Sequence, residues 1–129
     1  MPKKIYLLPV LLMSVLSFLS FQAPPEDLAD CLVKVKSAWG EHCSECGTST
    51  DTYIVYVMSK CKDKLDVMVG VQDKDSKIYK LSTFYGVIPS DTLRIFACKG
   101  SGKWLKWARK AGAPTFKFPT QSEVNEQYK

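Results

Sequence analysis

The sequence predicts an all-β protein, a small antiparallel β-sandwich of five to seven strands preceded by an N-terminal signal helix. Between residues 31 and 111, short runs of β-branched and aromatic residues recur every 10–15 positions, with polar or glycine-containing turns between them. No convincing helical stretch separates these runs, which argues against an alternating α/β arrangement. The chain is 129 residues long, which is enough for a single domain.

The first 23 residues have the features of an export signal. Lys3 and Lys4 precede an apolar run from Ile5 to Phe21, and the small Ala23 follows. This order predicts a signal peptide over residues 1–23. A retained membrane anchor is the alternative, because the run approaches the length that spans a bilayer. Either alternative places the rest of the chain in an oxidising space, secreted, periplasmic or in the cell envelope, where disulfides persist.

The remainder divides into three segments. Pro24 and Pro25 exclude a helix, so residues 24–30 are expected to be a linker. Residues 31–113 are expected to form the β-sandwich domain, and residues 114–129 an extended C-terminal tail.

Five strands are expected in the domain, over residues 31–36, 52–60, 65–72, 78–85 and 92–98. The second is apolar on both faces, which predicts a central strand. In the third, alternate residues from Leu65 to Val71 form one apolar face. Residues 103–111 fit either a helix or a strand. We favour a strand that forms a hairpin with 92–98, because every preceding element is a strand and the intervening loop is short.

The stretch L-S-T-F-Y-G-V-I-P-S-D-T-L-R-I at residues 81–95 resembles the strand–corner–strand passage of immunoglobulin-like sandwiches in secreted bacterial proteins. This resemblance covers about one fifth of the chain. It implies an immunoglobulin-like fold of no known activity, and it assigns no functional residue.

The five cysteines can be placed by strand direction. If each connection reverses the chain, Cys31 and Cys61 both lie at the end where the first strand starts, here called the bottom. Cys43, Cys46 and Cys98 then lie at the top. Because bonded cysteines need Cα atoms within about 7 Å, we predict a Cys31–Cys61 bond and a bond from Cys98 to either Cys43 or Cys46.

The motif H-C-S-E-C-G at residues 42–47 could also belong to a redox pair or a zinc site. A redox C-x-x-C needs a helix N-terminus, whereas a polar loop and a strand follow this one. A zinc site of His42, Cys43, Cys46 and Cys98 is the alternative, because all four would share the top. No other nucleophile or phosphate-loop motif is present, so we expect a protein without catalysis or cofactor.

The clearest functional signal is a basic, aromatic segment near the C-terminus. Residues 99–117 contain six basic residues and no acidic ones. Such a surface suits an anionic glycan, an envelope lipid headgroup or an acidic protein, and nucleic acid is not expected outside the cytoplasm. Trp104 and Trp107 should point to opposite faces of a strand, one buried and one exposed. The expected binding residues are Lys99, Lys103, Trp104, Lys106, Trp107, Arg109 and Lys110.

Overall fold

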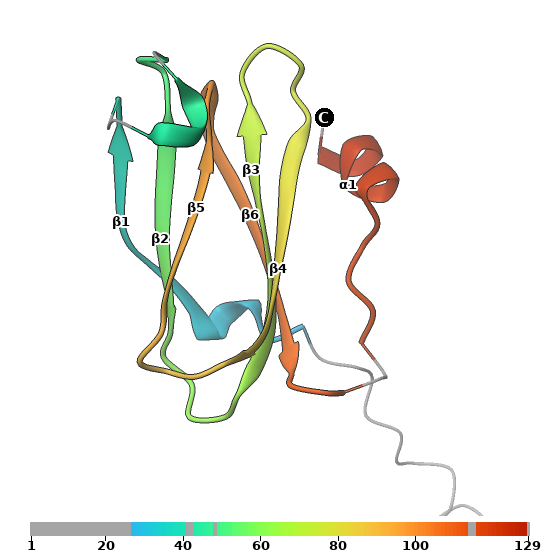
Figure 1. Cartoon of the computed structure of the whole chain (residues 1–129). Helices are drawn as coiled ribbons and strands as arrows, with labels where there is room; N and C mark the ends of the chain where they lie inside the picture. The colour runs from blue at the N-terminus through green and yellow to red at the C-terminus, as the bar shows by residue number, and fades with distance from the viewer. Residues whose placement is uncertain (1–26, 41–42, 48, 114–115, 129) are drawn as a thin grey trace, which may run out of the picture.

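The computed structural model describes residues 27–40, 43–47, 49–113 and 116–128. In these residues, six strands form two three-stranded antiparallel sheets, and a short helix follows them (Figure 1). The predicted signal helix lies outside the described residues. In chain order the elements are η2 (Ala29–Cys31), β1 (Leu32–Trp39), η3 (Ser44–Cys46), β2 (Tyr53–Ser59), β3 (Leu65–Asp73), β4 (Tyr79–Val87), β5 (Thr92–Ala97), β6 (Gly100–Lys110) and α1 (Gln121–Tyr128).

The strand order is β1-β2-β5 in one sheet and β4-β3-β6 in the other. The central position predicted for the second strand is confirmed, because β2 lies between β1 and β5. β3 is likewise central in the other sheet, with all its residues except Asp73 buried. One of its faces is apolar, and the other also buries the polar Asp66 and Gln72. The architecture is therefore all-β and sandwich-like. Each sheet has one central strand, β2 or β3, which is covered by neighbouring structure on both of its faces.

The predicted hairpin between β5 and the basic segment is wrong. The segment is a strand, but β6 pairs with β3 while β5 pairs with β2. Between them the chain crosses from one sheet to the other at Gly100. A Cβ added to Gly100 would lie 2.2 Å from the Cβ of Tyr53, so only glycine allows this passage.

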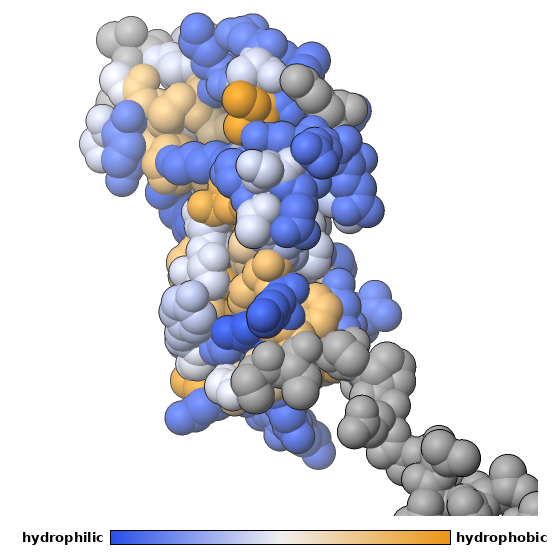
Figure 2. All heavy atoms as spheres, turned by 90° about the vertical axis from the view of Figure 1, so that its right-hand side faces the viewer, coloured by the Kyte–Doolittle hydropathy of each residue, from blue (hydrophilic) through white to orange (hydrophobic). Residues whose placement is uncertain are grey.

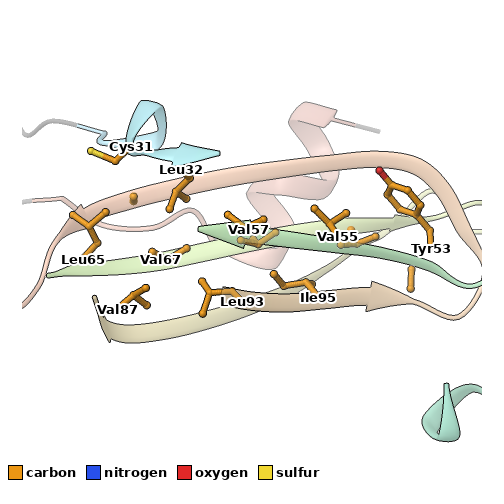
Figure 3. Close-up of a cluster of buried hydrophobic side chains, with 14 residues drawn as sticks. Cys31, Leu32, Tyr53, Val55, Val57, Leu65, Val67, Val87, Leu93 and Ile95 are labelled. Carbon is orange, nitrogen blue, oxygen red and sulfur yellow. The ribbon is translucent and has the colours of Figure 1, made fainter. Parts of the chain in front are cut away.

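The two sheets enclose a core of alternating side chains, several of which point toward one another in Figure 3. The apolar face predicted for the third strand is confirmed, since Leu65, Val67, Val69 and Val71 are fully buried. They meet the inward face of the other sheet, which includes Val55, Val57, Leu93 and Ile95.

The sheets are offset by about one strand. Across the interface, β3 contacts β5 and β2 contacts β6. In this arrangement β1 lies beyond the edge of β6, and none of the described strands of the second sheet is opposite it. The exposure of β1 agrees, because every residue from Val33 to Ser37 is exposed although all of them except Val35, at a shift in register, are paired with β2.

The C-terminal tail is not extended throughout, contrary to expectation, because residues 121–128 form α1. The tail folds back over the outer face of the second sheet, where Val124 is fully buried against Met68, Tyr79 and Trp107. In Figure 1, α1 lies beside β4. Figure 2 looks onto this side and shows only separate apolar areas among hydrophilic residues.

Candidate binding surface

Two disulfides fasten the first sheet at both ends. Cys31 bonds to Cys61 at the bottom and Cys46 to Cys98 at the top, with Cα–Cα distances of 5.3 and 5.2 Å. The predicted Cys31–Cys61 bond is confirmed. Cys98 was predicted to bond to Cys43 or Cys46, and its partner is Cys46. These bonds are consistent with an oxidising compartment. Within the described part of the chain, no helix has the length and apolar character needed to span a bilayer.

The remaining cysteine, Cys43, is buried as a free thiol. Its Sγ lies 2.8 Å from Glu45 Oε2, and the Arg94 guanidinium donates to the sulfur at 3.6 Å. The hydrogen bond from Cys43 is the main cause that lowers the pKa of Glu45, and the contact with Cys43 also raises the pKa of Arg94. This triad anchors the β1–β2 loop on the outer face of β5.

The zinc alternative required four ligands at the top. The Cys46–Cys98 bond uses two of those thiolates, and His42 lies outside the described residues. Among the residues that the structure describes, no group of three His, Cys, Asp or Glu side chains could hold a metal ion.

The residues predicted to bind through β6 have separate roles in the structure. Trp107 is buried beneath the C-terminal tail, with its ring against the edge of Tyr128. Trp104 lies on the opposite face, as predicted, but it is partly buried against the central core and not exposed. Lys99 is 3.6 Å from Asp75, an exposed ion pair. Lys103 and Lys110 are exposed, and neither forms an ion pair with another described residue.

Arg109 serves the fold. Its Nε donates to the Asp66 carboxylate at 3.1 Å, and its Nη1 donates to the carbonyl of Phe116 at 2.8 Å, which ties the tail to β6. Burial by itself raises the pKa of Asp66. The backbone N–H groups of Gly112 and Gly86, together with Arg109, outweigh burial and hold that pKa below its usual value.

Lys106 projects from the inward face of β6 at the sheet edge. Its Nζ donates to the carbonyl of Leu32 at 2.9 Å and lies 5.9 Å from the centre of the Trp104 ring. This lysine therefore links β6 to the start of β1. At the other end of the two strands, a Cβ on Gly102 would lie 3.1 Å from the Trp39 ring.

Sequence reasoning missed the contribution of β1 to this side of the molecule. Lys34, Lys36 and Trp39 are exposed, and Trp39 is 56% exposed although its ring packs 4.5 Å from that of Tyr53. The signal was present in V-K-V-K at residues 33–36, where apolar residues alternate with lysines inside the strand predicted over residues 31–36. Together with Lys103, Trp104 and Lys106 of β6, two of these residues form what we call the basic flank: Lys34, Trp39, Lys103, Trp104 and Lys106. Lys36 is not part of it, because its Nζ lies over the Tyr56 ring on the other face of β1.

Comparison with known proteins adds no classification. No protein-family model matches the chain, and neither the curated proteins nor the solved structures provide a match.

Proposed function

We propose that the protein is an exported, non-catalytic binding module that contacts an anionic partner through the basic flank. The observation that carries the proposal is the charge of the two edge strands. Neither β1 nor β6 contains an acidic residue, and none of the three lysines of the flank forms an ion pair with another described residue. A surface with one sign of charge attracts ligands of the other sign and speeds their association.

The aromatic residues of the basic flank add apolar contact area to its positive charge. Trp39 is more than half exposed and Trp104 partly buried, so both offer ring surface beside lysines. Indole rings contribute apolar contact area at low cost in side-chain entropy, and they are enriched at binding sites. A partner with negative charges and some apolar surface fits this combination.

The strand order supports an immunoglobulin-like assignment of the sandwich. The first, second and fifth strands share a sheet, and the third and sixth pair in the other, as A, B, E and C, F do in that architecture. Export is supported by the two disulfides and the N-terminal apolar run. N-terminal sequencing of the protein from its native cells tests cleavage, for which we expect Pro24 as the first residue.

Retention on polyglutamate and on an uncharged matrix tests the function. We expect retention on polyglutamate alone, with loss between about 50 and 500 mM salt as the charges are screened. A Lys34/Lys103/Lys106→Ala variant should elute earlier. The control is Lys60/Lys62/Lys64→Ala, which removes the same charge from exposed positions around the β2–β3 turn. Equal retention of the two variants would reject the basic flank as the contact surface.

A further inference from the structure

We infer that the partner is an extended acidic segment of another protein, which adds to the second sheet as a strand along the free edge of β6. This inference rests on the proposed function and specifies the chemical class and the conformation of the ligand. Three observations carry it: an unpaired edge, a vacant position opposite β1, and the charge around that position.

The edge of β6 is the first observation. β6 has 11 residues and pairs only with β3, so its other edge has no partner strand among the described residues. At the bottom, this edge already pairs with a piece of chain: Leu28 N donates to the carbonyl of Ala108 at 2.8 Å, and Ala108 N donates to Asp27 Oδ1 at 3.2 Å. By the alternation of an antiparallel strand, the backbone groups of Lys106 and Trp104 point the same way. In the described part of the chain no backbone group bonds to them on this edge, so a further strand could pair there.

The offset of the sheets supplies room. Since β2 lies over β6 and β5 over β3, a strand added to β6 would lie opposite β1. The chain after β6 does not occupy this position, because residues 116–128 cross the outer face of the sheet instead. β1 is already paired with β2 and its residues facing this position are exposed, so the added strand would bury a surface that the fold leaves exposed.

The register of β1 identifies the residues that face the vacant position. Lys34, Ser37 and Trp39 are opposite Val57, Val55 and Tyr53 of β2, whose side chains point into the core. The side chains of Lys34, Ser37 and Trp39 therefore point to the same side, and all three are exposed. Lys36, opposite Tyr56, belongs to the other face, where its Nζ lies 4.6 Å from the centre of the Tyr56 ring.

The positive charge around the vacant position favours an acidic partner strand. Lys106 on the edge strand and Lys34 on β1 both face the vacant position, and a lysine that points inward beside a free edge disfavours pairing with a purely apolar strand. A strand with carboxylates on its inward face would instead offer each lysine a counter-ion. Asp27, whose carboxylate already bonds to this edge, shows within the chain that an acidic residue fits there.

A synthetic peptide of alternating glutamate and valine, capped at both ends, tests the inference with the oxidised full-length chain. In an antiparallel addition, the inward-facing residues of the peptide are those whose N–H groups face β6. We compare the parent peptide with one N-methylated on the glutamates and one N-methylated on the valines. The two modified peptides have the same charge and lose the same number of donors.

We expect the parent peptide and the valine-methylated peptide to bind, and the glutamate-methylated peptide to bind at least about tenfold more weakly. The backbone amides of Trp104 and Lys106 should become protected from hydrogen exchange in the complex. On the protein side, Lys34→Gln should weaken binding severalfold, whereas Lys36→Gln, on the other face of the same strand, should change it by less than about twofold.

The outcomes separate this inference from the function on which it rests. If all three peptides bind equally and the two amides stay unprotected, strand addition is overturned while anionic binding stands. Binding to vesicles containing anionic lipid or to a sulfated glycan, with none to the parent peptide, also overturns it and leaves the proposed function intact. If neither the peptides, polyglutamate, the vesicles nor the glycan bind, both proposals fail.

Discussion

The carboxylate of Asp66, on β3, accepts a hydrogen bond of 3.1 Å from Nε of Arg109, its cross-strand partner on β6. Both side chains are largely withdrawn from water, 5% and 20% exposed respectively. The pair joins three segments, because Asp66 also accepts from the backbone of Gly86 and Gly112. Removing one member of a buried ion pair leaves the other without its partner, which makes this contact sensitive to mutation and to pH.

Asp66→Asn should lower the free energy of unfolding by about 2–3 kcal/mol, as measured by urea denaturation at neutral pH. The exposed Asp63→Asn is the control and should change it by less than about 0.5 kcal/mol. Because the folded protein holds the pKa of Asp66 below its usual value, the carboxylate stabilises the fold above about pH 4 and this contribution is lost as the pH falls further. The free energy of unfolding of Asp66→Asn should therefore fall less than that of the parent protein when the pH is lowered below about 4. An unchanged pH profile would contradict this role.

The burial of Val124 predicts that the C-terminal helix is an integral part of the fold. Val124→Ala removes two methyl groups from a fully buried position, and we expect a loss of about 1–2 kcal/mol in thermal or urea unfolding. Val35→Ala makes the same chemical change where the side chain is 53% exposed, and should cost less than about 0.5 kcal/mol. Equal effects of the two substitutions would mean that the helix does not pack on the sheet.

The passage at Gly100 predicts a steric requirement for glycine. In Gly100→Ala the new Cβ meets Tyr53 at 2.2 Å, so the crossing between sheets must shift, at a cost of about 3 kcal/mol. Gly112→Ala meets no neighbouring atom and should cost only the strain of a left-handed backbone, about 1 kcal/mol. Calorimetric melting of both variants checks the order, and a Gly100→Ala protein as stable as the parent would refute the close approach.

The state of the cysteines predicts a simple thiol count. The native protein has one free thiol, Cys43, and its burial should make it react slowly with a soluble thiol reagent until denaturant is added. Complete reduction should then expose five thiols. A rapid native reaction would place Cys43 at the surface, and more than one thiol before reduction would contradict the two disulfides. A Cys43→Ser variant supplies the blank.

Strand positions and the disulfide pairs could be predicted from sequence for different reasons. Alternation of apolar residues marks each strand locally, and the end at which a cysteine lies depends only on how many times the chain has reversed. Both inferences are independent of which sheet a strand joins. Sheet membership itself could not be predicted, because it depends on close contacts such as that of Gly100 with Tyr53.

The C-terminal helix could have been predicted in part. T-Q-S-E at residues 120–123 is a capping-box sequence, in which Thr120 accepts from the backbone of Glu123 at 3.3 Å and contacts its carboxylate. The hydrophobic signal was weak because only Val124 is buried in the helix. Without the helix and the rest of the tail, Trp107 and Arg109 had no visible partners, which is why both were predicted to bind a ligand. Their fold-stabilising contacts come from residues far along the chain.

The two disulfides enclose overlapping stretches of sequence, residues 31–61 and 46–98, and leave everything after Cys98 outside any covalent ring. The strand that we propose as the docking edge and the helix behind it are thus held by non-covalent contacts alone, including the ion pair of Arg109 with Asp66. Local opening of residues 99–128 breaks no cross-link, whereas β1, β2 and β5 stay fastened to one another. A ligand strand seated between β6 and β1 would bridge the cross-linked and the unlinked parts of the molecule, and would slow the opening of the segment to which it binds.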